Sequence, residues 1–495
     1  MDEIGKNFGK QVAMGALWLA GAKVFARLLT TVRLILLAAI LPQDQIGLFG
    51  LAAVVMQLLE TLSQTGMQTA LIQRKGNVQE YLGTAWVTQV VRGIILSIAT
   101  LLLADNFEVF FDKAGVASLL YILALVPVCF GIQNIGLVLL HRELRFSKVV
   151  GIQVGSAFVD LILSLLVALQ TPSAIALVWG RVGAAIFTAI ASFVLEKRWG
   201  NFSFSMSKSY ELFSFGVWVF ISAILSFTLV RGGDIVIGKL LTLEDLAVYQ
   251  IAYALACGPI MEVMAVIGGT ALPAYSQLQH QHTRLSSAFL RILASSSFLA
   301  SLSIVGFAIL AEDFTALFFG PEYKMMATLL PPLAIWGACR GLGASNSVLF
   351  LGIGRPAIAT VFQFFMLILF LVGLIPISIR YGIMGTVLSL ALIGLSAQAL
   401  RYFLIIHVVN ISGREIFKCL IIPICIATLS GVAAWISMSV ITPHLYALRL
   451  MIGGCVLLST FSLGSLWLDN YFRLGLRDFV QSVMPKRFAF VLGKN

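Results

Sequence analysis

The chain of 495 residues is 59% hydrophobic and only 11% charged, and its mean hydropathy is +0.98. Soluble domains carry about 25% charged residues, so this composition excludes a soluble multidomain protein and indicates a polytopic membrane protein. The net charge of +11 fits loops that face an anionic membrane leaflet, and nucleic acid is not an expected partner. The six cysteines lie in apolar runs without a Cys-x-x-Cys pair, so neither disulfide bonds nor a metal site is indicated.

Fourteen apolar segments are each long enough to cross a hydrocarbon core of about 30 Å as a helix. They cover residues 12–41, 46–70, 82–104, 115–140, 149–169, 173–195, 212–241, 246–273, 288–311, 325–352, 357–379, 383–408, 416–440 and 446–468. The connections between them are all short. The predicted fold class is therefore an all-α polytopic membrane protein with 14 transmembrane helices.

The charges of the connections predict the orientation. If the N-terminus is cytoplasmic, the inner connections and both tails carry most of the 33 Lys and Arg residues, whereas the outer connections carry only a few. Cytoplasmic loops are enriched in Lys and Arg. The bias therefore places both termini in the cytoplasm, which requires an even number of spans.

The two halves of the chain resemble each other. Trp18 has a counterpart in Trp218, and Gly131 has one in Gly341, so the offset grows slowly from 200 to 210 residues. A parallel repeat of six spans predicts two pseudo-symmetric lobes with a binding site between them near the membrane midplane. The predicted parts are an N-terminal lobe (1–200), a C-terminal lobe (201–411), two additional spans (412–470) and a basic tail (471–495), which is either an amphipathic surface helix or a solvated segment.

Thirteen charged residues inside the spans are relevant to such a site. They are Lys23, Arg27, Arg33, Arg92, Arg181, Arg231, Lys239, Arg340 and Arg401, with the acids Glu60, Asp160, Asp234 and Glu262. Each charge costs about 2.5–3.5 kcal/mol at the bilayer centre, so most must line a wet cavity or pair internally. The surplus of cations favours an anionic ligand, and the guanidinium fork suits phosphate.

Several of these charges have more than one interpretation. The deepest cations, which we expect in a substrate cavity, are Lys23, Arg27, Arg92 and Arg340. Arg181 is a further candidate, and Arg231 either joins the cavity or forms an ion pair with Asp234. Snorkelling towards the membrane surface is an alternative for the cations nearer span ends, namely Arg33, Lys239 and Arg401.

Three in-span acids are candidates for coupling transport to H⁺ or Na⁺. They are Glu60, Asp160 and Glu262. Neutralising a neighbouring arginine is the alternative role for each of them. The sequence contains no Walker A loop and no enzyme signature, so neither ATP nor another cofactor is expected and the chain is predicted not to be an enzyme.

The stretch GMQTALIQRKGNVQEYLGTAW, residues 66–86, resembles the segment after the second span of the polysaccharide transporter family. That family, with its Wzx-type and colanic-acid-exporter-like members, belongs to the multidrug/oligosaccharidyl-lipid/polysaccharide flippase superfamily. The resemblance implies a bacterial inner-membrane flippase for undecaprenyl-diphosphate-linked oligosaccharide, which works by alternating access. It implies membrane lipid as a partner, together with the polymerase and chain-length-control proteins of a surface-polysaccharide pathway.

Other functions remain open alternatives. A multidrug or cation exporter of the same superfamily would share the lobes, but it would be expected to have twelve spans and a more acidic cavity. A membrane glycan polymerase or ligase would need a sizeable external loop, which this chain lacks. A noncatalytic scaffold would not need charge at the midplane.

Overall fold

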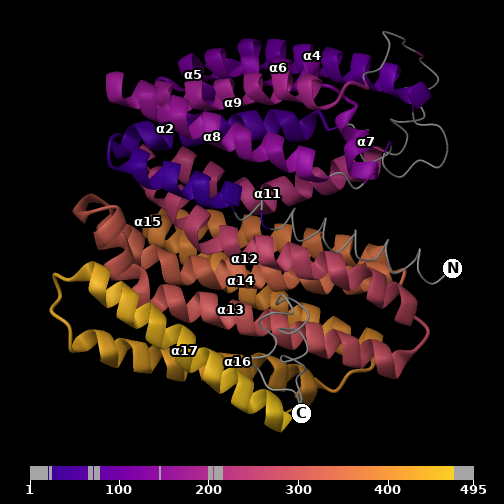
Figure 1. The fold of residues 1–495 in the computed structure, drawn as a ribbon, viewed down its shortest axis with the longest axis vertical. Coiled ribbons are helices and arrows are strands. Elements are labelled where there is room, and N and C mark those ends of the chain that lie inside the picture. Colours follow the sequence, from indigo (N-terminus) through magenta and orange to yellow (C-terminus); the bar gives the residue numbers. More distant parts are fainter. Residues whose placement is uncertain are drawn as a thin grey trace. The chain divides into compact units, whose positions relative to one another are not determined.

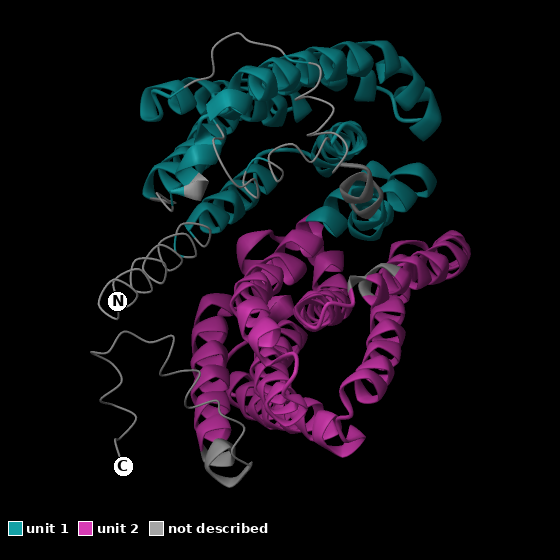
Figure 2. Ribbon diagram, turned by 90° about the vertical axis from the view of Figure 1, so that its right-hand side faces the viewer, with its two compact units in different colours: residues 1–250 teal, residues 251–495 magenta. Residues whose placement is uncertain are grey.

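The computed structural model shows an α-helical chain. It describes residues 21, 25–64, 71, 79–143, 146–198, 205 and 216–472. Two compact units divide the chain, Met1–Gln250 and Ile251–Asn495 (Figure 2). The boundary between the two units thus falls near residue 250. The two six-span lobes inferred from the repeat stay a prediction, and the tail beyond residue 472 lies outside the described residues.

The first unit is a bundle of helices (Figure 1). It begins with helical backbone over residues 25–38. There follow α2 (Gln43–Leu62), α4 (Gln79–Phe111), α5 (Val116–Leu123), α6 (Leu125–Ile132), α7 (Leu137–Arg142), α8 (Phe146–Gln170), α9 (Ala174–Leu195) and α11 (Gly216–Leu240). Helix α12 (Leu243–Leu278) starts in this unit and continues into the second one.

The second unit continues with α13 (His282–Phe318), η1 (Pro321–Tyr323), α14 (Lys324–Gly352), α15 (Pro356–Val409), α16 (Gly413–Ser439) and α17 (Tyr446–Phe472). Proline stands at the first turn of η1 and of α15, where a missing N–H costs nothing. Helix α15 ends at Asn410 in the left-handed conformation, a common helix stop. Helices α16 and α17, which are predicted to lie beyond the repeat, pack on α13.

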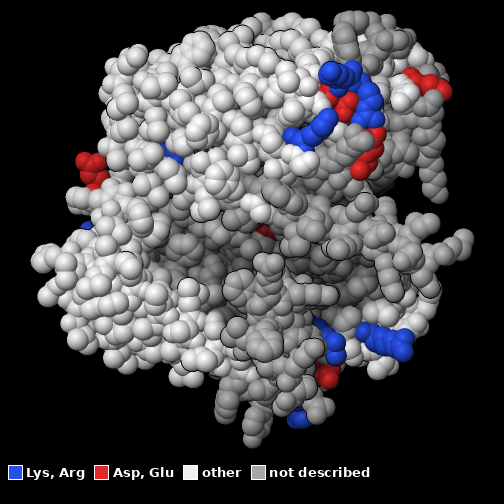
Figure 3. Space-filling model, viewed as in Figure 1, with Lys and Arg blue, Asp and Glu red and all other residues white. Residues whose placement is uncertain are grey.

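Every predicted span corresponds to helical backbone in the described residues, which confirms the fold class. Helix α15 holds two spans, because Gly382 interrupts it with non-helical backbone at φ 61° and ψ −148°. Nine of the described helices are long and apolar enough to cross a membrane. Large apolar side chains stay exposed along them, as at Ile95, Leu102 and Val372, and charged side chains are confined to few places on the described surface seen in Figure 3. A lipid environment accounts for that distribution.

One predicted span differs from expectation. Residues 115–140 were expected to form a single helix, but the structure breaks them into α5, α6 and the short α7. Their counterpart in the repeat, α14, runs unbroken over 29 residues even though it contains Pro331 and Pro332. Pro127 stands in the first turn of α6, directly after the break from α5, whereas residues 133–136 between α6 and α7 contain no proline. The second break therefore has another cause. The break matters for the site, because its exposed backbone groups are bonded by side chains of neighbouring helices.

Candidate functional site

A cavity of about 380 Å³ lies among the helices of the first unit. Its polar lining consists of Arg33, Gln57, Glu60, Asp160, Arg181 and Arg231, and its apolar lining consists of Phe49, Ala53, Met56, Leu123 and Val126. Helix α2 supplies five of these residues at helical spacing, so one face of that helix forms a wall. With three guanidinium groups and two carboxylates, the lining carries a net charge of +1.

Arg33 and Asp160 hold each other in this cavity. The Arg33 Nη1 lies 3.0 Å from Asp160 Oδ2, and its Nε donates a hydrogen bond of 3.0 Å to Ser164 Oγ. Ser164 in turn donates to the backbone oxygen of Asp160. Both charged side chains are largely buried, at 14% and 16% exposure. Snorkelling towards the membrane surface was the alternative for Arg33; the structure instead places its side chain inside the unit, where an acid from α8 compensates its charge.

Helix α9 approaches this pair closely at Gly180. A Cβ atom at that position would lie 2.6 Å from Asp160 Oδ1 and 2.8 Å from Ser164 Oγ. Any larger residue would therefore push the carboxylate away from Arg33. The glycine lets the backbone of α9 close the side of the cavity next to the ion pair.

Arg231 reaches the cavity from α11. Its Nε donates to Gln57 Oε1 at 2.6 Å, and its Nη1 lies 3.7 Å from Asp234 Oδ2. Asp234 is buried and also accepts a hydrogen bond of 2.7 Å from Gln250. The predicted pair with Asp234 is confirmed, but the distance is long and the Arg231 side chain is 33% exposed, so this guanidinium retains capacity for another anion.

Arg181 and Glu60 face the same space and lie close enough to interact electrostatically. Arg181 is exposed. No ion pair or side-chain hydrogen bond ties either side chain to another residue of the described ranges. A charged group without a bonded neighbour is free to bind a ligand. This pair therefore offers one cation and one anion to whatever enters the cavity.

The other predicted site residues lie elsewhere. Arg92 is beside the cavity, where its Nε donates to Ser63 Oγ at 3.0 Å and its Nη2 to the backbone oxygen of Glu60 at 3.3 Å. It thus caps the C-terminal end of α2, where a cation is favourable. Arg27 lies on the helix of residues 25–38 and is half-buried. Lys23 lies outside the described residues.

Arg340 and Glu262 belong to the second unit. The Arg340 Nη1 lies 2.7 Å from the Tyr253 hydroxyl oxygen, and the guanidinium lies 5.8 Å from the ring centroid of Trp336. Glu262 is exposed on α12. The roles of these residues in substrate contact or ion coupling stay predictions.

Side chains from α4 bond the broken end of α6. The Gln89 amide donates to the backbone oxygens of Phe130, Gly131 and Gln133 at 2.8, 3.2 and 3.2 Å. The Trp86 indole donates to Ile132 at 3.1 Å. Carbonyls at a helix end lack an intrahelical partner, and lipid offers none. Trp86 closes the motif that carries the family resemblance, so the motif includes a residue that supports this break.

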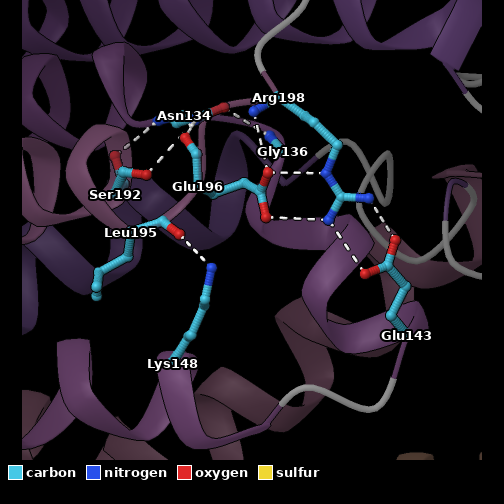
Figure 4. Close-up of polar contacts among 8 residues, drawn as sticks. All are labelled: Asn134, Gly136, Glu143, Lys148, Ser192, Leu195, Glu196 and Arg198. Carbon is cyan, nitrogen blue, oxygen red and sulfur yellow. Dashed lines mark hydrogen bonds and ion pairs between the residues drawn. The ribbon is translucent and has the colours of Figure 1, made fainter.

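On the other side of the break, a polar network joins α7 to the end of α9 (Figure 4). The Asn134 side chain accepts a hydrogen bond from the Gly136 N–H at 2.8 Å and donates to the backbone oxygen of Glu196 at 2.6 Å. The backbone N–H of Asn134 donates to Ser192 Oγ at 2.9 Å. The Lys148 ammonium donates to the Leu195 backbone oxygen at 2.7 Å, where the helix dipole favours a cation.

Arg198 is placed between two acids in the same network (Figure 4). Its Nε and Nη2 lie 2.8 and 3.0 Å from the two carboxylate oxygens of Glu196, and it also bonds Glu143 on the other edge. The Arg198 guanidinium lowers the pKa of the Glu196 carboxyl, and the two carboxylates raise the pKa of Arg198. This network lies just beyond the end of α9 and fixes the chain there.

These features define a multi-pass α-helical membrane protein with an arginine-bearing cavity among its spans. The chain belongs to the family described as "Polysaccharide biosynthesis protein", whose model matches residues 36–328. It is 25% identical to the lipopolysaccharide biosynthesis protein WzxC of Escherichia coli (strain K12) over 83% of this chain and 84% of that protein. It is 22% identical to the teichuronic acid biosynthesis protein TuaB of Bacillus subtilis (strain 168) over 88% and 90%.

Solved structures share the fold. The lipid II flippase MurJ in an inward closed conformation matches with a TM-score of 0.71 and 14% identity, over 90% of this chain and 98% of that one. An inward-facing multidrug resistance MATE family transporter matches with a TM-score of 0.60 and 18% identity, over 78% and 94%. At such identities the likeness establishes a common architecture and leaves the cargo open.

Proposed function

We propose that this protein is a flippase that carries undecaprenyl-diphosphate-linked oligosaccharide across the bacterial inner membrane for surface polysaccharide biosynthesis. The observation that carries the proposal is the cavity containing Arg33, Arg181 and Arg231 within a bundle of membrane spans. An arginine fork binds two oxygens of a phosphate group at once. Family membership and the relatives in polysaccharide biosynthesis support the same cargo.

In this mechanism the diphosphate docks on arginines of the central region while the prenyl tail stays in lipid. Arg181 and Arg231 are the cavity cations with the least compensated charge. Lys23, Arg27, Arg92 and Arg340 are the further proposed contacts. The lobes then alternate between inward-facing and outward-facing states. Transport, rather than bond chemistry, is the proposed activity, with both termini in the cytoplasm and with polymerase and chain-length-control proteins as pathway partners.

Coupling to H⁺ or Na⁺ is proposed for the in-span acids. Glu60 is the best placed of the three, because it lines the cavity and its carboxylate bonds no other described residue. Asp160 already neutralises Arg33, which favours its alternative role. Glu262 lies on the exposed face of α12. A carboxylate that binds either a cation or a proton would change the charge of the cavity during the cycle.

Export of organic cations is the second candidate, supported by the fold shared with a MATE family transporter. The charge of the cavity weighs against it, because a lining with three arginines and two acids repels a cationic drug. Asp160 is also bonded to Arg33 and is not free to bind one.

Complementation tests the proposal. The chain is expressed in strains that each lack the flippase for a different surface glycan, and the exported polysaccharide is measured. We expect restoration in at least one strain. Arg181→Gln and Arg231→Gln should reduce export at normal protein levels, whereas Lys197→Gln, an exposed cation outside the cavity, should not. A well-expressed chain that restores no glycan but lowers drug accumulation would favour the cation exporter.

A further inference from the structure

The second unit contains a buried arginine that forms no ion pair with an acid of the described residues. Arg401 lies on the second helical segment of α15, after Gly382, and is only 7% exposed. Its Cζ lies 4.1 Å from the ring centroid of Phe362, and its Nη1 lies 3.4 Å from Gln398 Oε1. Within the described part of the chain no carboxylate forms an ion pair with it. The sequence left snorkelling open for this residue, but its side chain is enclosed by protein.

Two other in-span arginines have a neighbouring carboxylate that Arg401 lacks. Arg33 is bonded to Asp160, and Arg231 lies near Asp234. A guanidinium cannot lose its proton in a protein, so it cannot escape the cost of burial by becoming neutral. The aromatic contact with Phe362 and one long hydrogen bond to a neutral amide recover only part of that cost.

Further hydrogen-bond donors lie near this charge. The Asn346 Nδ2 and the Tyr402 hydroxyl are both buried, and among the described residues neither has a hydrogen-bond partner other than the other one. These two side chains are neighbours, and Tyr402 also interacts electrostatically with Arg401. The Gln398 amide nitrogen is already committed to the backbone oxygen of Cys339. The cluster therefore offers a positive charge and unused N–H and O–H groups, and it is short of acceptors.

Helix α14 has a glycine, Gly343, where the Arg401 guanidinium packs against it. A Cβ atom on Gly343 would lie 2.0 Å from Arg401 Nη1, so only glycine leaves room for the guanidinium there. Asn346 follows three residues later and lies on the same face of α14. Apolar side chains of the unit's core, including Leu342 and Ile405, pack nearby. A ligand at this point must therefore be small.

We propose that Arg401, Asn346 and Tyr402 form a binding site for a small inorganic anion, with a halide such as chloride as its occupant. An anion accepts hydrogen bonds from all three groups and neutralises the buried charge. A compact halide fits a packed interior better than a phosphate group with its four oxygens. The site lies within the second unit and is separate from the cavity of Arg33 and Arg231. Its role is to stabilise the α14–α15 packing in the presence of salt.

Thermal unfolding of the full detergent-solubilised chain tests this proposal. Chloride is replaced stepwise by gluconate at constant ionic strength. We expect the unfolding temperature of the wild type to rise with chloride, since a ligand that binds only the folded state stabilises it. Arg401→Gln should lose this shift, whereas Arg355→Gln, an exposed arginine of the same unit, should keep it. A wild type that does not respond to chloride would overturn the proposal.

Two further variants keep the test decisive. If Arg401→Gln does not fold, Tyr402→Phe and Asn346→Leu retain the charge and remove one donor each, and both should weaken the chloride response. Arg231→Gln should leave it intact, because the cavity of the first unit is a different place. A response that survives all changes around Arg401, or that disappears in Arg231→Gln, refutes the assignment. In a bromide-soaked crystal, an anomalous peak beside Arg401 is the expected result, and an empty site there contradicts it.

Discussion

Arg33 and Asp160 form an ion pair between the first span and α8, with Nη1 3.0 Å from Oδ2. Removing one partner of a buried pair leaves an uncompensated charge and costs about 3–5 kcal/mol. Arg33→Gln and Asp160→Asn should therefore each lower the free energy of unfolding strongly, and the double variant should recover part of the loss. Denaturation of the four proteins gives a double-mutant cycle, with an expected coupling of about 1–3 kcal/mol. Additive losses would mean that the two side chains do not depend on each other.

Gly180 should tolerate no side chain. In Gly180→Ala the new Cβ would meet Asp160 Oδ1 at 2.6 Å, and crowding of this kind costs about 1–3 kcal/mol. We expect lower thermal stability and reduced glycan export in the complementation assay. Gly151→Ala on α8 is the matched control, because nothing lies within 4 Å of its Cβ position and alanine favours a helix by about 0.5–1 kcal/mol. Equal behaviour of the two variants would argue against close packing of α9 on the ion pair.

Gln89 should matter more than Trp86 for the broken end of α6. Gln89→Leu removes the donor for three backbone oxygens, and buried groups left without a partner cost about 1–3 kcal/mol. Trp86→Phe removes the donor for one. We expect the larger fall in unfolding temperature for Gln89→Leu, together with faster amide hydrogen exchange in residues 130–137. Unchanged exchange in both variants would contradict the bonding role.

The Glu196–Arg198 contact should make stability depend on pH. Arg198 lowers the pKa of Glu196 in the folded protein, so the stabilisation is fully present above the unfolded pKa of about 4.3. It is lost as the pH falls through the lower folded value. The difference in unfolding temperature between wild type and Glu196→Gln should therefore be largest near neutral pH and shrink below about pH 4. Lys197→Gln should show no such dependence, and a constant difference for Glu196→Gln would rule the pair out as its source.

The spans were predictable from the sequence because each membrane helix is a long run of apolar residues with high hydropathy. Short polar connections between long apolar runs located even the two spans joined at Gly382. The break between α6 and α7 was not predicted, because it depends on donors from α4 and on acceptors at the end of α9. Gln89 lies 41 residues before Phe130, and Asn134 lies 62 residues before Glu196, so only the folded bundle brings these partners together.

The charged residues were harder to interpret. Hydropathy gives the depth of a charge in the membrane but not the direction in which its helix faces. Arg33 and Arg401 both looked able to reach a surface, yet both are buried. One meets Asp160 from a distant span and the other meets Phe362. The pair of Arg231 and Asp234 was predictable, because residues at i and i+3 on a helix are neighbours whatever the tertiary structure.

Gly382 joins two spans through one residue whose φ of 61° and ψ of −148° lie in a region open essentially to glycine. The two helical segments of α15 are thus joined by a single non-helical residue and lack the freedom of relative movement that a longer loop provides. Neither can change its depth in the membrane without carrying the other, so they behave as a single mechanical element. Epitope tags or cysteine labels inserted at this turn would distort both segments. The connection between α16 and α17, around residues 440–445, is the gentler place to attach a reporter on that side of the membrane.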